Sequence, residues 1–200
     1  MKLEDGLVDV PAGKIAAVVT YLDMRAPPDP GSGTIAPDGL GIRHVPNPDV
    51  DWYRDLYRRV GEDWLWFSRL KLAREALAAI IQHPAVSVSA LTADGDDVGL
   101  LELDFRTPGA CELAFFGVVP AQIGRGAGRF LMAEATRQAW ARPIERFWVH
   151  TCTLDHPGAL QFYIRSGFQP YRRQIELAAD PRLEGVLERS AAPHVPLIDP

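Results

Sequence analysis

The spacing of hydrophobic positions changes several times along the chain, and each change predicts a different element. Lys14 to Met24 is rich in β-branched residues and predicts a strand. From Asp49 onward, apolar residues recur at helical spacing, which predicts one helix starting at Asp49 and a second over 63–82. The intervening segment 26–48 contains six prolines and no periodic pattern, so we expect a long loop there.

After Ala85 the period becomes two, which predicts an antiparallel meander with strands over 85–91, 98–105 and 112–119. A helix over 129–140, a strand over 147–153, a short helix over 157–165, a last strand over 171–177 and an irregular tail over 178–200 are expected to follow. This order predicts one domain over 1–200 of the α/β (α+β) class. Its sheet is expected to be mixed, mostly antiparallel, built of about six or seven strands and flanked by helices.

Composition and charge exclude some classes of function. The chain is 47% hydrophobic and 24% charged, which is typical of a globular protein. Its formal net charge of −5 argues against nucleic-acid binding, which favours a basic face, and is compatible with a cationic substrate such as an amine. No apolar run is long enough to span a membrane, and we expect no membrane partner.

The two cysteines and the N-terminus point to one compartment. Cys111 and Cys152 form neither a CxxC pair nor a disulfide framework, which fits a reducing environment. The first ten residues, MKLEDGLVDV, carry acidic residues where a signal peptide has an apolar core. We therefore expect a cytoplasmic protein.

The most informative stretch is 112–132, ELAFFGVVPAQIGRGAGRFLM. A strand that leads into a turn with three glycines and then a helix can form an anion site, because several N–H groups and the helix dipole point the same way. A nucleoside-triphosphate loop with Mg²⁺ is excluded, since Arg129 and Phe130 follow Gly128 instead of Lys and Ser or Thr. A dinucleotide fingerprint is excluded because Arg129 stands where its third glycine would be. The turn thus predicts a diphosphate without a metal ion, although a glycine-rich connection without a ligand fits about as well.

A second motif lies in the short helix, within DHPGALQFYIRSGF over 155–168. Ala159 and Tyr163 are four residues apart and share one helix face. Gly167 is placed to end the helix, and Phe168 to pack back on it. In isolation, Tyr163 reads as a half-buried aromatic residue on an amphipathic helix.

Together, the two motifs resemble the GNAT superfamily of acetyl-CoA-dependent N-acetyltransferases. Residues 123–128, IGRGAG, resemble its Arg/Gln-x-x-Gly-x-Gly/Ala signature, and 156–168 resemble its Asn-x-x-Ala-x-x-x-Tyr-x-x-x-Gly-Phe pattern. The resemblance covers about 85–177 in order and spacing. It implies a splay between the fourth and fifth expected strands, where the acetyl-CoA arm would bind.

The resemblance also implies the coenzyme contacts. The expected cofactor-binding residues are Phe116, Gly117 and Val118 on the strand, Gly124, Arg125, Gly126, Ala127, Gly128 and Arg129 in the turn, and His156. Two residues depart from the family pattern. Ile123 stands where Arg or Gln is usual, with Gln122 beside it, and His156 stands where Asn is common.

The implied reaction transfers an acetyl group from acetyl-CoA directly to a primary amine. Tyr163 is the candidate general acid or hydrogen-bond donor for the thiolate, and Glu112 is the candidate base, with His150 as an alternative. Gly117 suits a β-bulge, or else relieves crowding, and the N–H of Phe116 would polarise the thioester carbonyl. On a regular strand, Glu112 and Phe116 would share a face, about 13 Å apart. Cys152 reads as a small core residue.

Two other classes of function stay open. One is a coenzyme A-binding sensor or partner module with the same fold and little or no turnover. The other is an oligomerisation domain that uses Trp64 to Phe67 as its interface. This aromatic cluster is denser than one buried helix face needs; lining a pocket is an alternative, but a place in the core is the preferred interpretation. The acceptor, a small-molecule or peptide amine, is not fixed by the sequence, and a homodimer is compatible with it.

Overall fold

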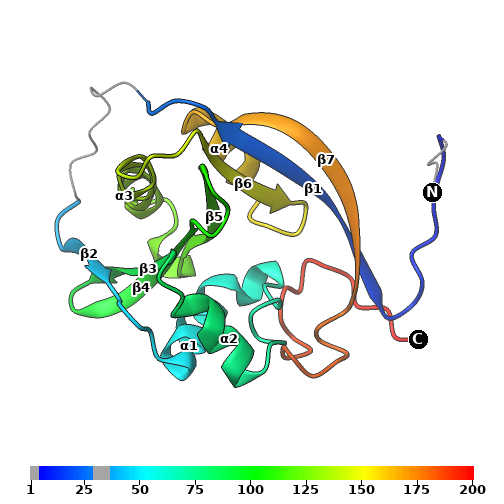
Figure 1. The fold of residues 1–200 in the computed structure, drawn as a ribbon. Helices are drawn as coiled ribbons and strands as arrows, with labels where there is room; N and C mark the ends of the chain where they lie inside the picture. Colours follow the sequence, from blue (N-terminus) through cyan, green and yellow to red (C-terminus); the bar gives the residue numbers. More distant parts are fainter. Residues whose placement is uncertain (1–4, 29–36) are drawn as a thin grey trace.

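A computed structural model describes residues 5–28 and 37–200 (Figure 1). Its strands are β1 (Lys14–Met24), β2 (Leu40–His44), β3 (Val86–Ala93), β4 (Asp96–Asp104), β5 (Ala110–Val118), β6 (Arg146–Cys152) and β7 (Gln169–Ala179). Its α-helices are α1 (Val50–Gly61), α2 (Arg74–Ile81), α3 (Ala127–Trp140) and α4 (Ala159–Arg165), with short 3₁₀ turns at Glu62–Trp64 and Pro120–Gln122.

The seven strands form one sheet in the order β2-β3-β4-β5-β6-β1-β7. All neighbouring strands are antiparallel except β5 and β6, which are parallel. This pair is joined only between 110–112 and 146–148, and beyond Glu112 the two strands separate. The predicted fold class, the meander and the splay between these two strands are therefore confirmed.

Helices cover both faces of the sheet. On one face, α3 and α4 pack on a core that includes Leu103, Leu131 and Phe147. On the other, α1 and α2 pack on a core that includes Tyr53, Leu77 and Leu100. Figure 1 shows α3 above the meander strands and α1 and α2 below them. The splay therefore opens between two helical layers.

Local signals account well for the ends of several elements. The Asp49 side chain accepts hydrogen bonds from the N–H groups of Asp51 and Trp52 and so caps α1. Asp94 and Gly95 both have positive φ, as the tight hairpin between β3 and β4 requires. These features follow from neighbouring residues alone.

Two predicted elements are wrong. The helix expected over 63–82 exists only from Arg74 to Ile81, because Leu65 takes a left-handed backbone conformation (φ +52°) that ends the 3₁₀ turn after α1. Leu65 is buried with Leu187 and Ala192 of the tail, a contact that helical spacing does not reveal. The loop expected over 26–48 contains β2, which pairs with β3; its residues 29–36 lie outside the described part.

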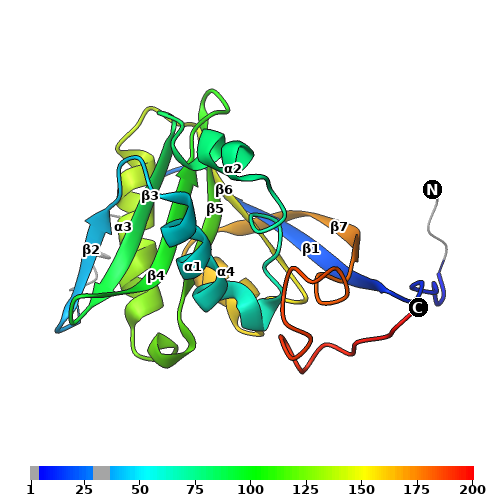
Figure 2. The ribbon, with the colours of Figure 1, turned by 90° about the horizontal axis from the view of Figure 1, so that it is seen from below.

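The tail after β7 has no helix or strand within 180–200, as predicted, yet it is tightly held. The buried Arg182 guanidinium pairs with Asp180 at 2.7 Å and donates to the backbone carbonyl of Val195 at 2.9 Å. Figure 2 shows the tail, orange to red, beside the segment that follows α1. Its apolar residues cover Leu65 and so support one wall of the site.

Candidate active site

The glycine turn leads into an uncapped helix N-terminus. Gly124 (φ +80°) and Gly126 (φ +87°) take left-handed conformations that disfavour other residues, and Gly126 is the N-cap of α3. No side chain of the described residues caps this helix end. The first N–H groups of α3 therefore have no partner within the helix and can receive an anion, as the sequence predicts.

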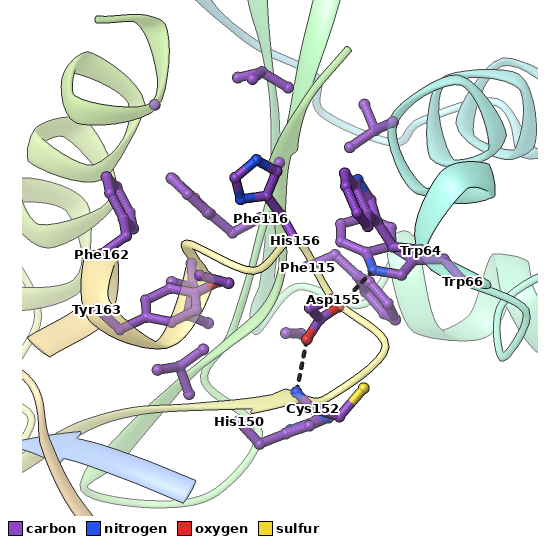
Figure 3. A pocket seen from close by; sticks show the side chains of 18 of the residues that line it. Trp64, Trp66, Phe115, Phe116, His150, Cys152, Asp155, His156, Phe162 and Tyr163 are labelled. Atoms are coloured by element: carbon purple, nitrogen blue, oxygen red, sulfur yellow. Dashed lines mark hydrogen bonds between the residues drawn. The ribbon is translucent and has the colours of Figure 1, made fainter. Parts of the chain in front are cut away.

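A cleft of about 1100 Å³ joins this turn to the splay (Figure 3). It collects side chains from both faces of the sheet, so it passes between β5 and β6. The sequence-predicted residues that line it are Glu112, Phe116, Gly117, Val118, Gly124, Gly126, Gly128, Arg129, His156 and Tyr163. Arg125 and Ala127 do not line it, and Ala127 is fully buried beneath the turn. The predicted residues that meet here lie up to 51 positions apart in sequence, from Glu112 to Tyr163.

A β-bulge in β5 decides which residues face which helical layer. Leu103 pairs with Leu113 and Glu102 pairs with Phe115, so Ala114 is an extra residue in β5. Phe116 therefore packs on the α3 and α4 side, whereas Phe115 packs on the α1 side. Glu112 lies on the same side as Phe115. The expectation that Glu112 and Phe116 share a face is wrong, because the bulge shifts the alternation by one.

Gly117 is not the bulge, because it pairs regularly with Leu100. A Cβ atom at Gly117 would lie 2.5 Å from Val60 and 3.2 Å from the Trp66 indole, and one at Gly61 would lie 2.3 Å from the same indole. Two glycines therefore make room for one tryptophan. The alternative expectation, that Gly117 relieves crowding, describes this position.

Tyr163 lies on α4 and is 7% exposed. Its ring packs against Phe116, Phe162 and Phe168, with centroids 6.2, 5.7 and 6.0 Å away. Burial, followed by the charge of Asp155, raises the Tyr163 pKa well above its ordinary value, so the phenol keeps its proton. Among the described residues, no group hydrogen-bonds to this hydroxyl.

Glu112 and His150 face each other where the strands separate. Glu112 Oε1 lies 3.7 Å from His150 Nδ1, too far for a direct hydrogen bond. Burial, and then the Asp104 carboxylate, raise the Glu112 pKa to about 7. Burial lowers the His150 pKa, so its imidazole is neutral near pH 7. This side of the cleft thus offers two groups able to accept a proton near neutral pH.

The Cys152 thiol lines the same cleft and is unreactive at neutral pH. Burial, and then the Asp155 charge, raise its pKa to about 12. A thiol in this state is a poor nucleophile. Cys152 was predicted to be a small core residue; it is half-buried and lines the cleft, so its predicted place in the core is wrong.

Asp155 is a residue that the sequence analysis missed. Its Oδ2 accepts hydrogen bonds from Thr151 Oγ1 (2.7 Å) and from the N–H of Cys152 (2.8 Å), and its Oδ1 accepts one from Trp66 Nε1 (3.2 Å). Figure 3 shows the last two bonds. Asp155 therefore ties the β6–α4 connection to the segment after α1. Its place three residues after the end of β6 and directly before His156 was the available signal.

His156 is engaged by its own turn. Its Nδ1 accepts a hydrogen bond from the N–H of Gly158 at 3.0 Å, and its ring lies 5.1 Å from that of Trp64. The Nδ1 atom is thus occupied in shaping the start of α4, and Nε2 is the nitrogen left to donate. His156 lines the cleft next to an aromatic residue of the opposite wall, and its contact with the coenzyme stays a prediction.

None of the helices in 5–28 and 37–200 is long and apolar enough to cross a membrane. Over the same ranges, no three His, Cys, Asp or Glu side chains are grouped so that they could hold a metal ion.

Solved structures with this fold include several acetyltransferases. A GCN5-related N-acetyltransferase from Sphaerobacter thermophilus is 17% identical over 82% of this chain and 51% of its own, with a TM-score of 0.63. An aminoglycoside acetyltransferase from an uncultured soil metagenomic sample is 17% identical over 64% of this chain and 88% of its own, with a TM-score of 0.53. The chain thus spans about half the length of the Sphaerobacter protein.

The sequence itself gives the family. No curated protein matches the sequence significantly. Residues 50–168 match the model described as the Acetyltransferase (GNAT) family, and this range includes the glycine turn, the splay and Tyr163. The chain therefore belongs to the GNAT acetyltransferase family.

Proposed function

We propose that this chain transfers an acetyl group from acetyl-CoA to a primary amine by direct attack. The observation that carries the proposal is the single cleft in which the glycine turn, the separated edge of β5 and Tyr163 meet. The family match and the fold alone would support only membership of an acetyltransferase family, because one fold hosts many functions.

The coenzyme would occupy the α3 and α4 side of the cleft. The free N–H groups at the start of α3 suit its pyrophosphate, and Arg125 and Arg129 add positive charge beside them. The backbone groups of β5 at Phe116, Gly117 and Val118 would hold the pantetheine arm, since β6 no longer pairs with this part of the strand. Acetyl-CoA supplies the thioester, and the protein supplies position.

The transfer needs one new bond and two proton movements. The amine nitrogen bonds to the carbonyl carbon, and the carbon–sulfur bond breaks. A backbone N–H near Phe116 would stabilise the oxyanion, and the Tyr163 hydroxyl would donate a hydrogen bond or a proton to the departing sulfur. A phenol with a raised pKa is a weak proton donor but remains an intact hydrogen-bond donor.

Glu112 would receive the proton that the amine loses. Its pKa of about 7 places it in the range in which a general base is effective at neutral pH. Glu112 lies on the α1 side of the sheet, so the amine would approach from the side opposite the coenzyme. His150, 3.7 Å away, or a water molecule between the two groups would complete the path.

The direct test measures thiol release from acetyl-CoA over a panel of amines, together with coenzyme A binding by calorimetry. The proposal expects micromolar to millimolar KM values for acetyl-CoA. It also expects amine-dependent thiol release that falls strongly in Tyr163→Phe and Glu112→Gln. Coenzyme A binding without thiol release for any amine would instead support a sensor or partner module with the same fold.

A further inference from the structure

The acceptor side of the cleft has an aromatic wall that the proposed chemistry does not use. Trp64, Trp66 and Phe67 follow α1, and Phe115 faces them from β5; all four are half-buried and line the cleft. Trp66 and Phe115 meet with ring centroids 5.3 Å apart. Figure 3 shows Trp64 and Trp66 across the cleft from Phe162 and Tyr163. Together, Trp64, Trp66, Phe67 and Phe115 are called the aromatic wall below.

The aromatic wall is held rigidly in place. Gly61 and Gly117 leave the space that the Trp66 indole fills, and its Nε1–H is fixed by Asp155. Leu65, between the two tryptophans, is anchored in the core formed with the tail. A pre-positioned aromatic surface binds apolar groups at low entropic cost. The wall is therefore suited to contact a ligand and not only to fill the core.

The positive charges on this side are already paired. Arg69 pairs with the fully buried Glu102 at 2.5 Å and lies over the Phe115 ring at 4.9 Å. Arg106 pairs with Asp104 at 2.5 Å. Neither guanidinium offers unbalanced charge to an anionic substrate.

The negative charge on this side is not fully paired. Glu112 makes no hydrogen bond to any described side chain, and its nearest basic group is the neutral His150. Three carboxylates, those of Glu102, Asp104 and Glu112, therefore face two guanidinium groups. The excess negative charge on this side of the cleft attracts a cationic substrate and repels one that carries a carboxylate.

We propose that the acceptor is a primary amine carried on an aromatic or similarly flat apolar body that bears no carboxylate. The body contacts the aromatic wall, and the ammonium group binds beside Glu112, which takes one proton and leaves the neutral amine. The second proton, which the nitrogen loses as the amide forms, goes to the departing thiolate. This inference rests on the proposed acetyl transfer and specifies its substrate class. A polar polyamine would leave the wall unused, and an α-amino acid would place a third carboxylate beside those of Glu112 and Asp104.

A matched set of acceptors tests the class. Thiol release from acetyl-CoA is measured with 2-phenylethylamine, with phenylalanine, which adds only a carboxylate, and with kanamycin, a polar polycation. We expect kcat/KM for 2-phenylethylamine to exceed both others by about tenfold or more, a ratio that one unfavourable charge contact produces. Equal or better use of phenylalanine or kanamycin overturns the inference but leaves acetyl transfer standing. No thiol release from any amine overturns both.

Variants of the wall give a second readout. Trp64→Ala is expected to raise KM for 2-phenylethylamine about tenfold while the KM for acetyl-CoA stays unchanged, and Trp64→Phe should restore most of the affinity. Trp52, on the outer part of α1, donates to Asp97 away from the cleft, so Trp52→Phe serves as the control. Equal changes in both KM values, or no change in either, would contradict a role for Trp64 in acceptor binding.

Discussion

Glu112 Oε1 lies 3.7 Å from His150 Nδ1 at the point where β5 and β6 separate. The two side chains come from parallel strands 38 residues apart in sequence, and both face the α1 side of the sheet. Burial raises the pKa of the acid and lowers the pKa of the base, so their proton affinities approach each other. This relationship defines the proton-accepting side of the cleft.

The pH dependence of turnover should report Glu112. Because its pKa is about 7 and the base must be deprotonated, kcat/KM is expected to rise with pH through about 7 and then level off. Glu112→Gln should lower kcat/KM by about 10²- to 10⁴-fold and abolish this rise. Initial rates between pH 5.5 and 9 measure both. An unchanged profile in Glu112→Gln would assign the base to another group, with His150→Gln as the next variant.

Glu112 should lower the free energy of unfolding at high pH. An acid whose folded-state pKa is raised stabilises the fold below its unfolded pKa of 4.5, and that stability is lost as pH rises to about 7. Glu112→Gln, which removes the buried charge, is therefore expected to be more stable than the parent at pH 8, by up to about 3 kcal/mol, and about equal at pH 4.5. Urea unfolding at the two pH values measures the difference. A variant that is less stable at pH 8 would contradict the burial of an unpaired carboxylate.

Tyr163→Phe should separate chemistry from folding. The hydroxyl has no hydrogen-bond partner among the described residues, so its removal is expected to leave thermal stability within about 0.5 kcal/mol. If this hydroxyl serves the departing thiolate, kcat should fall by about 10²-fold or more, with coenzyme A affinity little changed. Thermal unfolding measures the stability, titration calorimetry the coenzyme A affinity, and thiol release the kcat. Full turnover in Tyr163→Phe would remove Tyr163 from the mechanism.

Gly117→Ala should destabilise the fold, because the new methyl group would collide with Val60 and with the Trp66 indole. The new Cβ would lie 2.5 Å from Val60 and 3.2 Å from Trp66, so we expect a loss of about 1–3 kcal/mol and a shift in tryptophan fluorescence. Gly128→Ala is the control, because its Cβ would meet only Phe162, at 3.9 Å, within α3. Its stability should be unchanged or raised by up to about 1 kcal/mol. If urea unfolding shows the same change in the free energy of unfolding for both variants, the space beside Gly117 is not specifically required for the Trp66 indole.

The tail should depend on its buried ion pair. Arg182 and Asp180 are 1% and 2% exposed, so Arg182→Ala leaves a buried carboxylate without its partner and is expected to cost about 3–5 kcal/mol. The pair Arg189–Asp199 lies in the same tail but is more than half exposed, and Arg189→Ala should change stability by less than about 0.5 kcal/mol. Thermal unfolding compares the two variants. Similar melting temperatures would contradict the conclusion that the Arg182–Asp180 pair holds the tail in place.

Much of the fold could be predicted because its signals are local. The meander, the hairpin at Asp94–Gly95 and the cap at Asp49 depend on residues within a few positions of one another. The helix expected over 63–82 failed because Leu65 is held by residues of the tail more than a hundred positions away. Helical spacing cannot register such a contact.

For the candidate site, the sequence by itself determined the glycine turn, the Tyr163 helix and their order, because each is a local backbone or helix pattern. Only the tertiary structure decided that Ala114 is the bulge, that Glu112 and Phe116 therefore face opposite sides, and that Trp66 reaches Asp155. Strand register, burial and the pKa shifts they cause depend on which distant segments pack together. That is why the coenzyme side could be expected from motifs, whereas the acceptor side became visible only in the folded chain.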